Sequence, residues 1–122
     1  MPKNVLVVDD SGVMRKMIGR SLRQAGLDCG EIFEGGDGVE GLSLLSSHPE
    51  VALILSDWNM PNMDGITFVK EVRAKGINTP IVMITTEATD SRVADVKAAG
   101  ANGYVCKPFT PEALQKELGG FF

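Results

Sequence analysis

Five short apolar runs alternate along the chain with longer stretches in which apolar and polar residues mix. Three of these runs, at residues 5–8, 51–55 and 81–84, are continuous and rich in aliphatic, largely β-branched side chains. Continuous runs of this length are typical of strands that are buried on both faces of a parallel sheet. Two shorter runs, at residues 31–34 and 103–106, predict strands closer to the sheet edges.

The stretches that follow the runs carry helix signals. An aspartate opens each of the stretches 37–46, 64–75 and 90–99. Because a short acidic side chain accepts hydrogen bonds from the first free N–H groups of a helix, we expect Asp37 and Asp90 to act as N-caps. These three stretches therefore predict three helices.

Two further helices complete the pattern. Thr110 followed by Pro111 predicts the start of a helix near the end of the chain. In residues 13–25 the apolar positions recur at intervals of three and four, which predicts a single buried stripe. The stripe consists of Val13, Met14, Met17, Ile18, Leu22 and Ala25.

The order of elements is strand then helix, repeated five times. This alternation predicts an α/β fold, a doubly wound parallel sheet with helices on both faces. The chain shows no linker or internal repeat, so we expect residues 1–122 to form one domain with no output domain attached.

Composition narrows the function classes. The formal net charge of −4 argues against a nucleic-acid-binding protein, which usually has a basic face. No apolar run approaches the ~20 residues of a membrane span. The two cysteines, Cys29 and Cys106, form no metal or redox motif and are expected to be reduced thiols in a cytoplasmic protein.

Polar residues stand where the predicted strands end. In an open parallel sheet the carboxyl ends of the strands meet at one edge, which is where ligands bind. We therefore expect the side chains that follow four of the runs to lie together. They are Asp9 and Asp10, Asp57, Thr85 with Thr86, and Lys107.

Three carboxylates at one edge need a cation. Two unit charges ~4 Å apart repel by ~4 kcal/mol at an effective dielectric constant near 20. Lys107 supplies one positive charge, and a hard divalent cation such as Mg²⁺ accepts carboxylate oxygens. A carboxylate beside a metal and an ammonium is a nucleophile suited to a phosphoryl group. Thr85 is placed to donate a hydrogen bond to phosphoryl oxygens.

The chain resembles the receiver domain of bacterial two-component response regulators over essentially its whole length, and several segments carry the resemblance. They are residues 7–11 (VVDDS), residues 57–65 (DWNMPNMDG), Thr85, and residues 104–109 (YVCKPF). Residues 57–65 are similar in particular to the single-domain chemotaxis regulators of the CheY type. The resemblance implies a flavodoxin-like (βα)5 fold with strand order 2-1-3-4-5.

The resemblance also implies roles at the acidic edge. Asp57 is the expected phosphoacceptor. Asp9 and Asp10 are expected to hold Mg²⁺, or Mn²⁺, together with Asp57 and the backbone carbonyl of Asn59. Lys107 is expected to pair with the transferred phosphoryl group, and its bond to the following proline is cis in the family.

Further positions are implied to control the response. Thr85 and Tyr104 form the expected switch pair, and Asn59, Thr86 and Glu87 are expected to tune dephosphorylation. Trp58, next to the acceptor, is expected to shield the site or report on it. Thr86 departs from the smaller residue that is common in the family. Two other departures, Asp90 and Glu117, stand where enteric flagellar regulators have lysines.

The implied function is a phosphorylation-activated signalling switch, not an enzyme. A histidine kinase is the expected donor. The expected target binds the surface of the fourth helix, fifth strand and fifth helix, and in chemotaxis it is the flagellar motor switch. A phosphatase is a further expected partner. We expect a cytoplasmic monomer that binds neither nucleic acid nor membrane.

Other functions remain open from the residues alone. A phosphate sink or a regulator of a pathway other than chemotaxis uses the same site. A phosphoaspartyl phosphohydrolase usually needs a cap or a second acid two residues after the nucleophile, where this chain has Asn59. A flavin-binding electron carrier of similar topology is disfavoured because Asp9 and Asp10 repel a phosphate.

Overall fold

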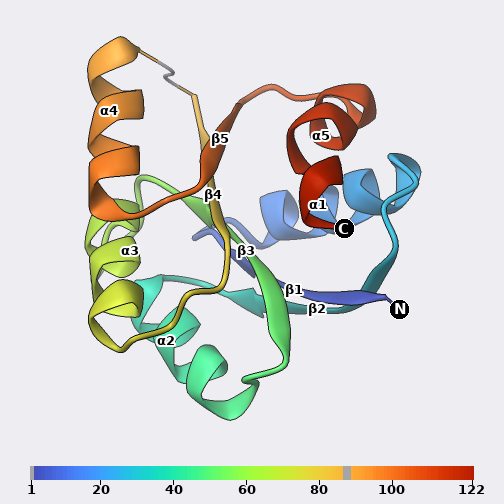
Figure 1. Ribbon diagram of the computed structural model, residues 1–122. Helices are drawn as coiled ribbons and strands as arrows, with labels where there is room; N and C mark the ends of the chain where they lie inside the picture. The colour runs from blue at the N-terminus through green and yellow to red at the C-terminus, as the bar shows by residue number, and fades with distance from the viewer. Residues whose placement is uncertain (1, 87–88) are drawn as a thin grey trace.

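Five parallel strands form the central sheet, in the order β2-β1-β3-β4-β5 (Figure 1). The computed structural model describes residues 2–86 and 89–122. The flavodoxin-like α/β fold and the strand order predicted above are confirmed, and the two shorter runs are the edge strands. The strands are β1 (Lys3–Val8), β2 (Cys29–Gly35), β3 (Val51–Asp57), β4 (Ile81–Thr85) and β5 (Gly103–Cys106).

Helices cover both faces of the sheet (Figure 1). Two of them, α1 (Gly12–Gln24) and α5 (Pro111–Leu118), lie on one face. The other face carries α2 (Gly38–Ser47), α3 (Gly65–Ala74) and α4 (Asp90–Ala99). A short 3₁₀ helix, Gly119–Phe121, follows α5.

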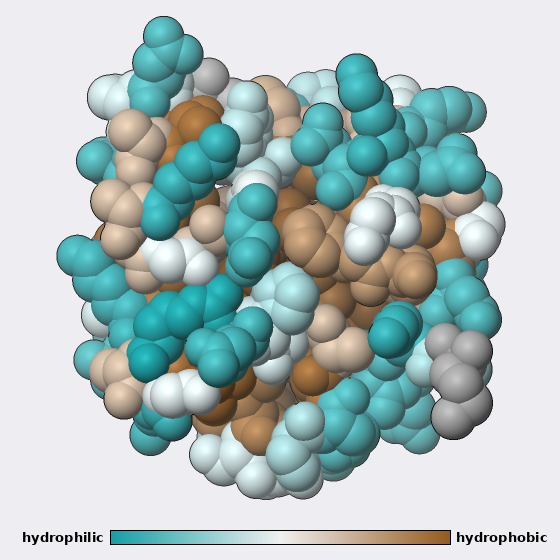
Figure 2. Space-filling model, in the orientation of Figure 1, coloured by the Kyte–Doolittle hydropathy of each residue, from teal (hydrophilic) through white to brown (hydrophobic). Residues whose placement is uncertain are grey.

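The sheet divides the core into two clusters of buried side chains. Leu6, Ile54 and Met83 point to the cluster under α2, α3 and α4, whereas Val7 and Leu55 point to the cluster under α1 and α5. Successive residues of a strand face opposite sides, so the central strands are apolar throughout. Figure 2 shows hydrophobic residues still visible around the C-terminal end of the chain, whose last two phenylalanines are partly buried against the second cluster.

One predicted helix start is wrong. We expected Asp90 to cap α4, but the N-cap is Thr89, whose Oγ1 accepts a hydrogen bond from the backbone N–H of Arg92. Thr89 has extended backbone angles, as an N-cap residue does, and Asp90 is the first helical residue. The Asp90 carboxylate still interacts favourably with the positive end of the helix dipole. The caps of α2 and α5 are Asp37 and Thr110, as predicted.

The predicted stripe of α1 is too wide. Ile18 and Leu22 are buried, but Val13 is 73% exposed and Met17 is 49% exposed. Each lies one residue, about 100° of helix rotation, from a position that packs inward. A helix that rests on one sheet face buries only part of its circumference, so Val13 and Met17 fall outside the contact.

Arg73 joins two loops at the amino-terminal edge of the sheet. Its guanidinium donates hydrogen bonds to the backbone oxygens of Ile77, Thr79 and Gly100 and to Oδ1 of Asn102. These contacts hold the end of α3 against the start of β4 and the α4–β5 connection. In the part of the chain that the structure describes, no helix has the length and apolar character to cross a membrane.

Candidate functional site

The carboxyl edge of the sheet brings three aspartates together. Asp9 and Asp10 follow β1, and Asp57 is the last residue of β3, the strand beside it. One carboxylate oxygen from each of the three lies within 4.8 Å of the others. Parallel pairing of neighbouring strands creates this cluster from residues that are almost fifty positions apart.

Lys107 reaches the same cluster from β5. Its Nζ donates to Oδ2 of Asp9 at 3.2 Å and to Oδ1 of Asp57 at 3.3 Å. The three side chains are 13%, 2% and 14% exposed, respectively, so these ion pairs are shielded from water. The backbone N–H of Lys107 donates to the carbonyl of Thr85 at 2.6 Å, which fixes the backbone of Lys107 against the end of β4.

Burial is the main influence on the Asp57 carboxyl. It raises the pKa of Asp57 above its usual value, and the negative charge of Asp9 raises it further. The Lys107 ammonium and the backbone N–H of Trp58, which donates to Asp57 Oδ1 at 2.8 Å, act in the opposite direction. The net shift is upward, so the ionised form of Asp57 is held at a cost to the fold.

Asparagine at position 57 is therefore expected to stabilise the fold at neutral pH. A carboxyl whose pKa is raised on folding contributes stability below its unfolded pKa and loses that contribution as pH rises through the folded pKa. Urea unfolding should show Asp57→Asn to be more stable than wild type near pH 7, with a smaller difference near pH 4. An equal difference at both pH values would contradict this origin of the effect.

The segment that follows Asp57 is fixed at both ends. The N–H of Gly65 donates to the carbonyl of Trp58 at 2.8 Å and closes the loop. Asn62 has a left-handed backbone, with φ of 66°, and its side chain donates to Oδ2 of Asp37 at 2.7 Å. Asn59 lies in this loop and is exposed. Its carbonyl as a metal ligand stays a prediction.

The donor set fits a hard divalent cation. Carboxylate oxygens are the ligands that Mg²⁺ and Mn²⁺ prefer, and both ions bind with water completing the shell. Asp10 is exposed and Asp57 is partly open, whereas Asp9 is buried. The backbone N–H of Ser11 orients Asp9 by donating to its Oδ1 at 2.9 Å. A cation here would relieve the repulsion between the acids.

The two expected switch residues lie on one face of the sheet. Met83 and Tyr104 are register partners in β4 and β5, and Thr85 is two positions beyond Met83. Thr85 is buried, and Tyr104 is half-buried against the cluster under α2, α3 and α4. Both side chains therefore lie on the side of the sheet that α2, α3 and α4 cover.

Three positions that depart from the family pattern are at the surface. Thr86 is exposed, as are Asp90 and Glu117 on the helices of the expected target surface. Glu87 lies outside the described residues. Thr86 follows directly after β4, and its role in tuning stays a prediction.

The Trp58 indole contacts groups outside the acid cluster. It lines a groove of about 430 Å³ between α3 and α4, beside Ile66 and Asp95. The Arg92 guanidinium lies 4.5 Å from the centre of the ring, a cation–π contact that the sequence did not indicate. The backbone contact of Trp58 with Asp57 places it to report on changes at the site, and its role in shielding or reporting stays a prediction.

The sheet order and the acid cluster with its lysine define a receiver domain, and the chain belongs to the response regulator receiver domain family, which matches residues 5–119. It is similar to chemotaxis proteins of the CheY type. It is 43% identical over 116 residues to the CheY homolog of Campylobacter jejuni, covering 93% of this chain and 88% of that protein. Identity to CheY1 of Helicobacter pylori is 40% over 116 residues, covering 93% and 92%.

Solved structures give the same placement. CheY4 of Vibrio cholerae is 40% identical with a TM-score of 0.88, and the match covers 100% of both chains. A CheX–CheY complex with BeF3 and Mg²⁺ from Borrelia burgdorferi matches at 28% identity and a TM-score of 0.89, over 100% of this chain and 91% of that one. The protein is a receiver of a two-component system with chemotaxis homologues.

Proposed function

We propose that this protein is a signalling switch that accepts a phosphoryl group on Asp57 from a histidine kinase. The observation that carries the proposal is the position of Lys107, whose ammonium bridges the buried Asp9 and the partly open Asp57. A fixed positive charge beside a nucleophilic carboxylate offsets the negative charge of an incoming phosphoryl group. Asp57 is the one of these two acids with an approach from solvent.

The transfer is a substitution at phosphorus. An oxygen of Asp57 forms a bond to phosphorus while the bond from phosphorus to the donor's histidine nitrogen breaks. The imidazole nitrogen leaves with the bonding electron pair, and the donor's imidazole ring is neutral when one of its two nitrogens carries a proton. Asp9, Asp10, Asp57 and the Asn59 carbonyl would hold Mg²⁺ or Mn²⁺, which supplies charge neutralisation for the phosphoryl oxygens when bound.

The response is proposed to pass through Thr85 and Tyr104. The Thr85 hydroxyl turns toward the new phosphoryl oxygens, and the half-buried Tyr104 ring fills the space left beside β4. This changes the surface formed by α4, β5 and α5, where a target protein binds. A local change in charge thereby biases an element with two arrangements.

Chemotaxis is the proposed pathway, because the similar relatives are chemotaxis proteins. The flagellar motor switch is the proposed target, and a phosphatase acts at the edge tuned by Asn59, Thr86 and Glu87. The Borrelia burgdorferi complex supports a protein partner and Mg²⁺ at this fold. We propose that the protein is monomeric and cytoplasmic and passes its signal to a partner protein.

The test is a single covalent phosphorylation. Incubation with acetyl phosphate and Mg²⁺ should add the mass of one phosphoryl group to the intact protein, and omission of Mg²⁺ should prevent the addition. The adduct should be labile to hydroxylamine, as an acyl phosphate is. Continuous hydrolysis of a phosphoester over many turnovers would contradict a switch and favour a phosphohydrolase.

Mg²⁺ alone is expected to quench the fluorescence of Trp58, the one tryptophan of the chain. A cation at the acid cluster would offset the negative charge of Asp57, whose Oδ1 accepts a hydrogen bond from the backbone N–H of Trp58. The measurement is an emission titration into the millimolar range at constant ionic strength. Asp10→Asn is the control and should need more Mg²⁺. Unchanged emission in the wild type would contradict a metal site at this edge.

A further inference from the structure

We propose that Arg15 is a positioning residue for the metal-binding pair Asp9 and Asp10. Its Nη1 donates to the backbone carbonyl of Asp9 at 2.6 Å. That carbonyl belongs to the peptide unit that joins the two aspartates. Since a peptide unit is planar and includes the Cα atoms of both aspartates, a contact that holds its oxygen restrains the orientation of the backbone from which both side chains project.

Besides the contact from Lys107 to Oδ2 of Asp9, two hydrogen bonds hold this residue. The Asp9 N–H donates to the carbonyl of Gly35 at 3.0 Å, and its Oδ1 accepts from Ser11. These bonds hold the residue from the β2 side and from the start of α1. Arg15 holds the remaining polar group of the Asp9 backbone, at the point where the chain leaves β1.

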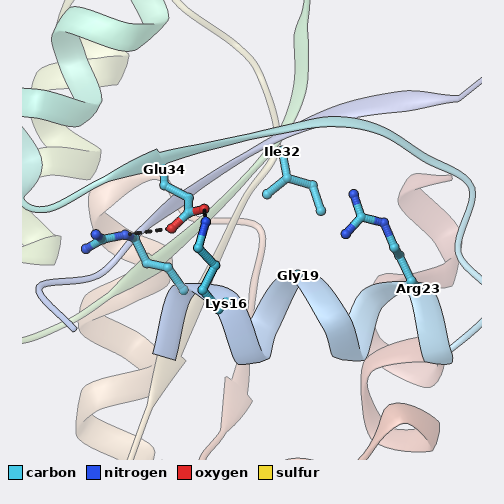
Figure 3. Close-up of a pocket in the computed structure, with 6 residues that line it drawn as sticks. Lys16, Gly19, Arg23, Ile32 and Glu34 are labelled. Carbon is cyan, nitrogen blue, oxygen red and sulfur yellow. Dashed lines mark hydrogen bonds and ion pairs between the residues drawn. The ribbon is translucent and has the colours of Figure 1, made fainter. Parts of the chain in front are cut away.

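Arg15 is itself held in place by Glu34. Its Nε donates to Oε1 of Glu34 at 3.1 Å, and the two side chains are 21% and 23% exposed. Lys16 reaches the second carboxylate oxygen of Glu34 from α1, as Figure 3 shows. The hydrogen bonds from Lys16 and Arg15 lower the pKa of Glu34, so it stays ionised. The guanidinium therefore forks between a carboxylate on β2 and the Asp9 carbonyl, which the single ammonium of a lysine does not reproduce.

Lys16 is the natural comparison, because it shares Glu34 but makes a different contribution. It is 74% exposed and its described hydrogen bond goes to Glu34. Lys16 and Arg15 both line a pocket of about 220 Å³ between α1 and β2, with Arg23 at its other end (Figure 3). The pocket is open, and Glu34 already pairs with Arg15 and Lys16. We therefore assign the function of Arg15 to its contact with Asp9 and propose no ligand in the pocket.

An effect of charge and an effect of positioning predict opposite changes in Mg²⁺ affinity when Arg15 is replaced. A positive charge near a cation site repels the cation, so simple electrostatics predicts that loss of the Arg15 charge tightens Mg²⁺ binding. Loss of a group that orients a metal ligand weakens binding by roughly 10- to 100-fold. Arg15→Lys keeps the charge and removes the fork, and Arg15→Gln removes both. Positioning predicts weaker binding in each variant.

The experiment is calorimetric titration of Mg²⁺ into wild type, Arg15→Lys, Arg15→Gln and the control Lys16→Gln. We expect the dissociation constant of both Arg15 variants to rise by about tenfold and that of the control to stay within about twofold. Unfolding in metal-free buffer is followed in parallel. Arg73→Lys, which is altered at the opposite edge of the sheet, shows whether lower stability alone weakens Mg²⁺ binding, and we expect its affinity to equal that of wild type.

The outcomes separate this inference from the proposed function on which it rests. Absence of Mg²⁺ binding by the wild type would overturn the metal site itself. Wild-type binding with unchanged affinity in Arg15→Lys, or with tighter binding in Arg15→Gln, would overturn the positioning role of Arg15 and leave the proposed function standing. A loss of affinity in Arg73→Lys equal to that in Arg15→Lys would also overturn it.

Discussion

Replacement of Asp57 by asparagine is expected to abolish phosphoryl uptake from acetyl phosphate in the presence of Mg²⁺. The amide is similar in size to the carboxylate, but it carries no charge and its oxygen is a poor nucleophile toward phosphorus. Asp9 does not replace it, because that carboxylate is 2% exposed and is occupied by Lys107 and the Ser11 N–H. Intact-mass measurement should show the phosphorylated species in the wild type and none in Asp57→Asn.

The matched control is Asp28→Asn, which removes one exposed carboxylate far from the acidic edge. It should take up phosphate at the wild-type rate, which separates the loss of one negative charge from the loss of the acceptor. Undiminished labelling of Asp57→Asn would place the phosphoryl group on another residue. Asp57→Asn should also remain folded, since the substitution is expected to stabilise the chain at neutral pH.

Gly65→Ala is expected to lower the free energy of unfolding more than the other variants proposed for this protein. A Cβ at this position would lie 2.3 Å from the carbonyl oxygen of Asp57 and 2.6 Å from Cε of Met83. Both neighbours are part of the buried sheet, so the backbone must shift. Overpacking typically costs ~1–3 kcal/mol, and contact with a backbone atom places this change near ~3 kcal/mol. The midpoint of thermal unfolding should fall by on the order of 10 °C.

Gly103→Ala is the control for Gly65→Ala. Its added Cβ meets no atom within 4 Å, and its backbone is not in the left-handed region. The midpoint of this variant should stay close to that of wild type. A change of less than about 0.5 kcal/mol in Gly65→Ala would contradict the steric argument. The same shift at the carbonyl of Asp57 should also lower the rate of phosphoryl uptake.

Much of the fold was predictable because local chemistry and burial agree along the chain. The runs at 5–8, 51–55 and 81–84 are β1, β3 and β4, the strands buried on both faces. The exposure of Val13 and Met17 was not predictable from their spacing. Apolar periodicity shows which side of a helix packs, but the width of the contact depends on neighbouring elements that only the assembled fold supplies.

The residues at the strand ends were equally accessible to sequence reasoning. Asp9, Asp10, Asp57 and Lys107 each follow an apolar run, and parallel pairing brings them to one edge. Their chemistry follows from charge alone, since acids at this separation need a cation. The roles of these residues in phosphoryl transfer stay predictions that the experiments above address.

The contacts that support the site were not predictable from the sequence. Arg15 carries no sequence signal that links it to the Asp9 carbonyl, and Arg92 carries none that links it to Trp58. A long flexible side chain reaches many neighbours, and the choice among them depends on how the elements pack. The same holds for Thr89, which caps α4 in place of the adjacent Asp90 because the turn of the chain selects between two suitable residues.

By itself the sequence determined the order of strands and helices, the acidic edge and the charge that must be neutralised there. These depend on periodicity and on residue type, which are local properties of the chain. The tertiary structure alone decided that Lys107 bridges Asp9 and Asp57, that Gly65 has no room for a side chain, and that Arg15 donates to the carbonyl between Asp9 and Asp10. Those are distances between atoms on different elements, and distances exist only once the sheet and its helices have packed.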